Sequence, residues 1–198
     1  MVLDSKSEKR KDAMILLHEI YGVNQFIQEQ SKKFVEDGYD VFCPNMIDRD
    51  SFSYEESIEA YDFFMNNVGF DVYKEISNLV KELKDKYDNV FIIGFSAGAT
   101  IAWRCSENSL CSGIVACYGS RIRDYANTNP SCPTLLIFAK KDSFDVHALT
   151  CQLQDKKHVS ILECDAQHGF LDPYSKHYNN TQSRLAEEAI ACVINECK

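Results

Sequence analysis

The chain has 198 residues, of which 45% are hydrophobic and 26% are charged, proportions close to those of an average globular domain. Its formal net charge of -9 at pH 7 would repel a phosphate backbone, which disfavours nucleic acid as a partner. The longest apolar runs are far too short to cross a bilayer, so we also expect no membrane attachment.

The N-terminal segment turns charged within a few residues and has neither the apolar core nor the cleavage site of a secretory signal. The chain carries nine cysteines, an odd number without CxxC or Cys/His ligand spacing, which favours reduced thiols over disulfides or a metal site. We therefore expect a cytoplasmic protein. Its length predicts one domain over residues 1–198, with 1–12 as a flexible or edge segment.

Apolar, β-rich runs alternate along the chain with stretches of helical spacing. The predicted strands are Ala13–Leu17, Asp40–Cys43, Val90–Phe95, Gly113–Tyr118, Thr134–Ala139 and Val159–Cys164. The predicted helices are Gln25–Glu36, Tyr54–Asn66, Tyr73–Lys86, Ala97–Ser106, Asp145–Gln154 and Thr181–Cys197. The runs are continuously apolar, as in strands that helices cover on both faces. The pattern predicts an α/β fold with a mostly parallel, doubly wound sheet.

The segment from Gly119 to Pro133 interrupts this alternation and is expected to be a loop. It carries Arg121 and Arg123, and loops at strand ends are where such folds bind ligands. No repeat or linker divides the chain, and no stretch is long enough for a separate lid domain.

A candidate nucleophile lies in Gly94-Phe95-Ser96-Ala97-Gly98, between a buried strand and an alanine-rich helical stretch. This arrangement is typical of a nucleophile elbow, in which a serine sits on a tight strand-to-helix turn and glycines let the flanking chain pass. The alternative is that Gly94 and Gly98 only allow the turn and that Ser96 merely caps the helix. A dinucleotide-binding turn fits less well, because Ser96 stands where that fingerprint needs its second glycine.

A serine hydroxyl needs a base to take its proton and a carboxylate to orient that base. In α/β-hydrolases the order along the chain is Ser, acid, His, each just beyond a strand. Asp142 and His168 follow apolar runs in that order. Asp145 is a rival acid three residues later, and the spacing favours Asp142. Without Ser96, the simpler interpretation of His168 is a loop histidine held by local hydrogen bonds, and the alternative for Asp142 is an ordinary turn aspartate.

The third requirement is an oxyanion hole made of backbone N–H groups. Ala97, the residue after Ser96, is the first expected donor. Ile20, in the stretch LLHEIYGVN after the first strand, is the expected second donor.

At this point the sequence resembles the dienelactone hydrolase family. The resemblance rests on LLHEIYGVNQFIQEQSKKFVEDGYDVFCPNM, on GFSAGA, on CYG, on the strand ending in Asp142 and on His168-Gly169-Phe170, and it covers nearly the whole chain. It implies a single-domain α/β-hydrolase without a lid and a Ser96–Asp142–His168 triad. The implied backbone donors are those of Ile20 and Ala97.

Two features depart from that family. The type member uses a cysteine where this chain has Ser96, and its glutamate at the position of Glu19 takes part in activating that cysteine; beside a serine, Glu19 is a candidate to shape the pocket instead. The arginines that hold the substrate carboxylate in that family have no match here. Arg49, Arg121 and Arg123 could substitute, although the usual place of such a charge is the solvated surface.

The sequence therefore predicts a serine hydrolase that cleaves small carboxylic esters or lactones through an acyl-enzyme, with no cofactor or metal. Tyr21, Tyr118 and Phe170 are further candidates to line the pocket, although aromatic residues at strand ends are as often packing residues. Two alternatives stay open. The same triad could cleave thioesters or amides, or the chain could be a non-catalytic α/β binding module, in which His168 would lie far from Ser96.

Overall fold

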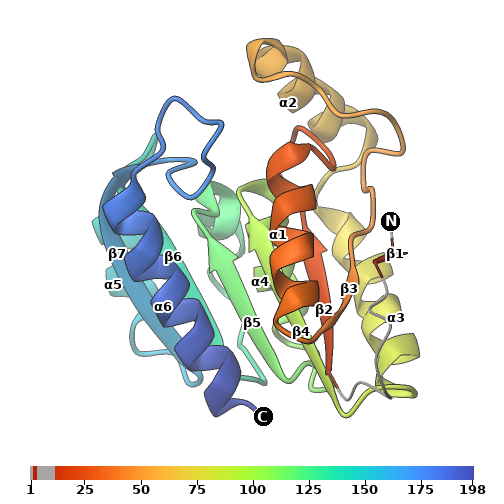
Figure 1. Ribbon diagram of the computed structural model, residues 1–198. Helices are drawn as coiled ribbons and strands as arrows, with labels where there is room; N and C mark the ends of the chain where they lie inside the picture. The colour runs from red at the N-terminus through yellow and green to blue at the C-terminus, as the bar shows by residue number, and fades with distance from the viewer. Residues whose placement is uncertain (1, 4–11) are drawn as a thin grey trace.

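The computed structural model describes residues 2–3 and 12–198, and its strands form one sheet in the order β1-β3-β2-β4-β5-β6-β7 (Figure 1). The strands are β1 (Val2–Leu3), β2 (Asp12–Leu17), β3 (Asp40–Phe42), β4 (Asn89–Phe95), β5 (Gly113–Cys117), β6 (Thr134–Lys141) and β7 (Val159–Gln167). Strand β1 pairs antiparallel with β3, and every other pairing is parallel. The predicted mostly parallel sheet is confirmed. Of the expected flexible or edge segment 1–12, residues 1 and 4–11 lie outside the described residues.

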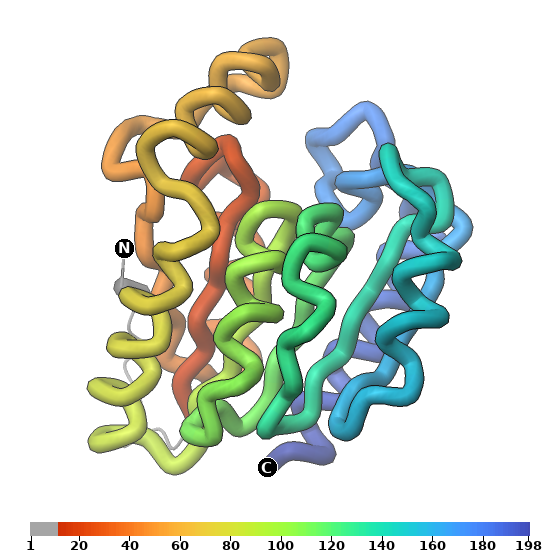
Figure 2. Tube along the Cα trace, turned by 180° about the vertical axis from the view of Figure 1, so that it is seen from behind, coloured from red at the N-terminus to blue at the C-terminus, as the bar shows by residue number. Residues whose placement is uncertain are grey.

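Helices cover both faces of this sheet, as Figures 1 and 2 show from opposite sides. The α-helices are α1 (Gln25–Glu36), α2 (Ser57–Asn67), α3 (Tyr73–Lys84), α4 (Ala97–Cys105), α5 (Val146–Leu153) and α6 (Asn180–Glu196). Short 3-10 helices are η1 (Tyr54–Glu56), η2 (Phe70–Val72) and η3 (Ser120–Tyr125). Helices α1 and α6 pack on one face, and α3, α4 and α5 pack on the other. No separate lid domain is inserted within the described residues, which confirms the doubly wound fold without a lid.

The continuous apolar runs follow from this two-sided cover. In β2, Met14 and Leu16 pack toward α1, while Ile15 and Leu17 pack toward α3 and α4, because successive side chains of a strand point to opposite faces. All four side chains are fully buried. The edge strand β7 is the exception, since most of its residues are exposed or partly exposed.

Some boundaries differ from those expected from the sequence. Strands β6 and β7 continue beyond their apolar runs through polar residues, because the backbone ladder persists where the side chains reach solvent; Lys141 and Asp165 form an ion pair of 2.8 Å there. The predicted helix Tyr54–Asn66 is split into η1 and α2, and the predicted loop Gly119–Pro133 contains η3. The edge strand β1 had no sequence signal.

The carboxyl ends of the parallel strands lie at one edge of the sheet, and the loops that follow them gather there (Figure 1). Helix α2 stands above this edge, apart from the helical layers (Figures 1 and 2). Ligands of open parallel sheets bind at this edge. Among the described helices, none combines the length and the apolarity that crossing a bilayer requires.

Candidate active site

Ser96 lies on a strained turn between β4 and α4. Its backbone φ of 51° and ψ of -109° place it in a sparsely populated region for a residue with a side chain. The two glycines of the motif allow this turn by letting backbone pass closely. A Cβ on Gly94 would lie 2.1 Å from the Gly98 carbonyl oxygen, and a Cβ on Gly98 would lie 2.3 Å from the Leu17 carbonyl oxygen.

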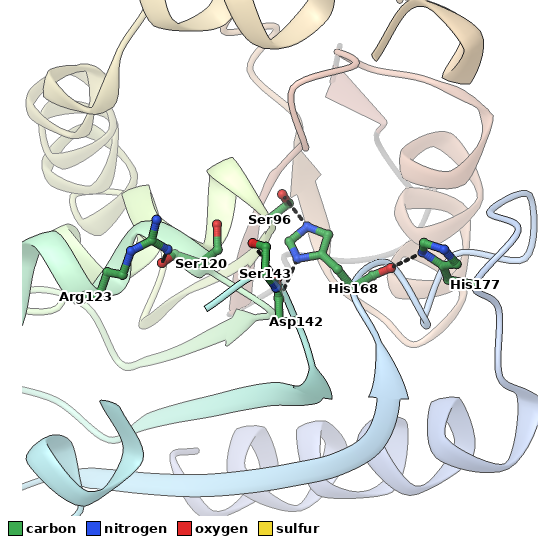
Figure 3. A network of polar contacts seen from close by, with 7 residues as sticks. All are labelled: Ser96, Ser120, Arg123, Asp142, Ser143, His168 and His177. Atoms are coloured by element: carbon green, nitrogen blue, oxygen red, sulfur yellow. Dashed lines mark hydrogen bonds and ion pairs between the residues drawn. The ribbon is translucent and has the colours of Figure 1, made fainter. Parts of the chain in front are cut away.

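A line of hydrogen bonds joins Ser96, His168 and Asp142 (Figure 3). The distance from Ser96 Oγ to His168 Nε2 is 2.9 Å, and His168 Nδ1 lies 2.7 Å from Asp142 Oδ2. The three residues follow β4, β7 and β6, which explains how positions 72 and 26 residues apart in the chain meet. Ser143 also supports Asp142 Oδ1, through its backbone N–H at 2.6 Å and its hydroxyl at 3.1 Å.

These contacts set the charges of the pair. Burial raises the pKa of Asp142, but the hydrogen bond and charge of His168 and the hydrogen bonds from Ser143 outweigh it, so the pKa is lowered overall. Burial lowers the pKa of His168, but the hydrogen bond to Asp142 and the charges of Asp142 and Glu19 raise it overall. The arrangement can therefore stabilise an imidazolium on His168 beside an ionised Asp142.

Two backbone N–H groups lie beside Ser96 without partners among the described residues, those of Ile20 and Ala97. Both residues line the cavity in front of Ser96. The Gly98 N–H donates to the His18 carbonyl at 3.1 Å, which ties the start of α4 to the loop after β2. The structure thus brings Ile20 and Ala97 to the side of Ser96, as the sequence led us to expect.

His18 orients the Ile20 amide. Its Nε2 accepts a hydrogen bond of 2.9 Å from the Met46 N–H, so the ring proton sits on Nδ1 and is donated to the Glu19 carbonyl at 2.5 Å. Burial lowers the pKa of His18 to about 4, so this neutral form persists at neutral pH. In a trans peptide the C=O and the N–H point in opposite directions. The Ile20 N–H is therefore held pointing away from His18.

Glu19 is a buried carboxylic acid beside this site, with a side chain only 5% exposed. Its Oε1 is completely buried and has no hydrogen-bond partner among the described residues, and the Tyr118 hydroxyl is the polar group that interacts with the carboxyl. Burial raises its pKa to about 7, with a further increase from the charge of Asp172 and decreases from His168 and from the nearby Tyr118 hydroxyl. Near neutral pH, Glu19 is thus present in both its neutral and its ionised form.

Two cavities meet at Ser96 and His168. The first, which we call the Phe70 cavity, has a volume of about 410 Å³. Its lining consists of Ile20, Tyr61, Phe64, Phe70, Ser96, Ala97, Ser120, Arg121, Lys141, Asp142, Ser143, Gln167, His168 and His177. Its apolar part comes from α2 and η2, which lie above the sheet edge.

The second, which we call the Glu19 cavity, has a volume of about 610 Å³ and exposes more polar surface than the Phe70 cavity does. Its lining consists of Glu19, Ile20, Tyr21, Tyr54, Glu55, Ser57, Ser96, His168, Gly169, Asp172, Tyr174, Ser175, Lys176 and His177. Within the described part of the chain, no cluster of three or more His, Cys, Asp or Glu side chains is arranged to hold a metal ion.

Two of the residues expected to line the pocket do not do so. Glu19 and Tyr21 reach the Glu19 cavity, but Tyr118 and Phe170 reach neither cavity. Both are fully buried because they pack behind His168, where the Tyr118 ring lies 5.0 Å from the His168 ring and 5.7 Å from that of Phe170. They support the histidine from within the core.

Of the three arginines considered from the sequence, one reaches the site. Arg121 lines the Phe70 cavity, and its Nε lies 2.6 Å from Asp124 Oδ2. Arg49 stacks on the ring of Phe52 with 3.9 Å between guanidinium carbon and ring centroid. Arg123 donates to the Ser120 carbonyl (Figure 3).

Several residues of the site have no clear signal in the sequence. His177 donates a hydrogen bond from Nδ1 to the His168 carbonyl at 3.0 Å (Figure 3) and lines both cavities. The Tyr54 hydroxyl donates to Asp172 Oδ2 across 118 residues of sequence. The only sequence signal for His177 is a polar loop nine residues after His168, and nothing in the sequence links Tyr54 to Asp172.

Comparisons with known proteins bear on the family and the fold. Residues 1–197 match the dienelactone hydrolase family. The chain is 40% identical over 174 residues to the uncharacterized protein YczH of Bacillus subtilis (strain 168), covering 85% of each chain. It resembles a Klebsiella pneumoniae protein assigned as a dienelactone hydrolase, with a TM-score of 0.80, 18% identity, and coverage of 94% of this chain and 88% of that one.

A further similar structure is a dienelactone hydrolase-like promiscuous phosphotriesterase from metagenomic libraries. Its TM-score is 0.73 at 16% identity, with 98% of this chain and 90% of that chain covered. These two structural likenesses establish the fold, and the match over residues 1–197 establishes the family. The chain belongs to the dienelactone hydrolase family, α/β-hydrolases that act on ester bonds.

Proposed function

We propose that the protein hydrolyses small carboxylic esters or lactones through an acyl-enzyme on Ser96. Ser96 Oγ attacks the carbonyl carbon while its proton passes to His168 Nε2, and Asp142 stabilises the resulting imidazolium. The Ile20 and Ala97 N–H groups hold the oxyanion. The bond to the leaving oxygen then breaks, and His168 returns the proton to that oxygen. A water molecule repeats the sequence on the acyl-enzyme, releasing the acid and restoring Ser96.

The observation that carries this proposal is the hydrogen-bonded line from Ser96 through His168 to Asp142. A distance of 2.9 Å between Ser96 Oγ and His168 Nε2 is within reach for proton transfer in the resting protein. The strained backbone of Ser96 and the two free amides beside it support the same assignment. A binding module would have no need of this combination.

The test is the Ser96→Ala variant, assayed with p-nitrophenyl acetate and labelled with a fluorophosphonate. We expect labelling to be lost and turnover to fall by about 10⁶-fold, to the assay background, since a triad without its nucleophile retains little activity. Ser160→Ala, at an exposed serine of β7, is the matched control and should keep both. Unchanged hydrolysis in Ser96→Ala would remove the proposal.

Thioesters and amides are the alternative substrates, because they would react through the same residues. A panel that keeps one acyl group and changes only the leaving atom from oxygen to sulfur or nitrogen separates these reactions by kcat/KM. A cytoplasmic location, and the exclusion of nucleic acid and membranes as partners, stay predictions from the sequence.

A further inference from the structure

The two cavities that meet at Ser96 offer different chemistry to the two parts of a substrate. The apolar surface of the Phe70 cavity comes mainly from Ile20, Phe64 and Phe70. The Glu19 cavity exposes much more polar surface than the Phe70 cavity, because hydroxyl, carboxyl and imidazole groups line it beside the rings of its tyrosines. An ester with one hydrocarbon part and one polar part would therefore bind in a defined orientation.

Glu19 is the side chain that most needs a ligand in this cavity. A buried polar group without a hydrogen-bond partner is unusual and calls for an explanation. Glu19 lines the cavity and is 5% exposed, and its Oε1 has no hydrogen-bond partner among the described residues. A hydrocarbon placed against the carboxyl would offer it no hydrogen bond, whereas a hydroxyl can accept from the neutral acid and donate to the carboxylate.

The walls of the cavity are fixed by their own contacts. The Tyr54 hydroxyl donates to Asp172 and accepts from Asn24 Nδ2 at 3.0 Å. The Tyr21 ring packs edge-on against Tyr54, with 4.9 Å between ring centroids. The hydroxyls of Tyr21 and Ser57 make no hydrogen bond within residues 2–3 and 12–198, so they too are available to a ligand.

The charges disfavour other polar ligands. Glu19 and Asp172 would repel a carboxylate or a phosphate, and Glu55 adds a third acid at the cavity. Lys176 and His177 line the same cavity and make it less suited to a cation. A neutral group with several hydroxyls satisfies the available donors and acceptors without either conflict.

We propose that the Glu19 cavity binds a hydroxyl-bearing part of the ester substrate and that Glu19 selects it. This inference rests on the proposed esterase function. The substrate class is then an ester of a polyol or of a hydroxy acid, whose hydrocarbon part occupies the Phe70 cavity.

The test compares matched esters that differ only in hydroxyl groups. Glyceryl monobutyrate is paired with propyl butyrate, and methyl lactate with methyl propionate, so that the hydroxyls lie in the alcohol in one pair and in the acyl group in the other. For each pair we measure the ratio of kcat/KM values. We expect the wild-type protein to prefer the hydroxylated ester by about tenfold in at least one pair, as one buried hydrogen bond provides.

Two substitutions at Glu19 test whether its carboxyl causes that preference. Glu19→Met removes the carboxyl and should bring the ratio close to one, while Glu19→Gln keeps a donor and an acceptor and should retain part of the preference. Tyr61→Leu, which changes the Phe70 cavity, should leave the ratio at its wild-type value. Using a ratio removes any general effect of a variant on turnover.

The outcomes separate this inference from the function on which it rests. If no ester is hydrolysed, or if hydrolysis survives in Ser96→Ala, the esterase proposal itself fails. If hydrolysis depends on Ser96 but the wild-type protein shows no preference in either pair, the inference about the Glu19 cavity is wrong. A preference that Glu19→Met retains in full would overturn it equally.

Discussion

Asp142 and Glu19 are two buried carboxyl groups of one site, and they differ in the partners that surround them. The Asp142 side chain is 3% exposed and accepts hydrogen bonds from His168 and Ser143, so its pKa is lowered. Glu19 is comparably buried, its Oε1 has no partner, and only the Tyr118 hydroxyl interacts with the carboxyl, so burial raises its pKa to about 7. Burial acts on both groups in the same direction, and the hydrogen-bond partners decide which one stays ionised.

The largest effect is expected where the partnered carboxyl is lost. Asp142→Asn should lower kcat by about 10⁴-fold, because an amide in place of the carboxylate favours the wrong His168 tautomer and cannot stabilise the imidazolium. The measurement is turnover of p-nitrophenyl acetate. Asp145→Asn is the matched control, since Asp145 caps α5 by accepting from the Ala148 N–H at 2.9 Å and asparagine caps equally well. A large loss in Asp145→Asn with activity kept in Asp142→Asn would reverse the assignment.

This pair of aspartates shows how far sequence reasoning reaches. The spacing along the chain favours Asp142 over Asp145, and Asp142 is the residue that contacts His168. The strand that precedes each of Ser96 and His168 likewise points to these two residues. A residue directly after a parallel strand has its place at the sheet edge fixed by the fold, so position along the chain is enough to bring such residues together.

The rest of the site depends on contacts that the sequence does not encode locally. Tyr54 meets Asp172 only because the segment before α2 folds back over the sheet edge. Tyr118 follows a strand as the candidate residues do, yet it points into the core behind His168. Packing sets the direction of side chains and the course of long connections. The spacing of residues along the chain therefore does not predict the two cavities.

The buried carboxyl of Glu19 should make the stability of the protein depend on pH. Since the pKa of Glu19 is about 7 in the folded protein and 4.5 in its ordinary state, the folded state binds more protons between these values. The contribution of Glu19 to the free energy of unfolding is therefore fully present below pH 4.5 and is lost as the pH rises through 7. The wild-type protein should lose roughly 2 to 3 kcal/mol of unfolding free energy from this group between pH 5 and pH 8, and Glu19→Gln should lose none of it.

Urea unfolding of both proteins at the two pH values measures this difference directly. Glu36→Gln, at an exposed position near the end of α1, is the control and should change stability by less than about 0.5 kcal/mol at either pH. A stability difference between Glu19→Gln and wild type that is the same at both pH values would mean that Glu19 finds a partner for its charge in solution.

The smallest effect we expect links the two carboxyls through His168. The charge of Glu19 is one of the causes that raise the pKa of His168, after the hydrogen bond and charge of Asp142. Removing that charge in Glu19→Gln should stabilise the imidazolium less and lower the pKa of His168. Because the neutral imidazole is the base, the acid limb of the kcat/KM profile should move to lower pH.

The profile is measured with an ester that does not itself titrate. The control is Asp165→Asn, at an exposed residue paired with Lys141, which should leave the acid limb in place. If the acid limb moves to higher pH in Glu19→Gln, Glu19 acts on His168 through something other than its charge. Glu19 and Asp142 would then differ in where they lie relative to His168 and not in whether they are ionised.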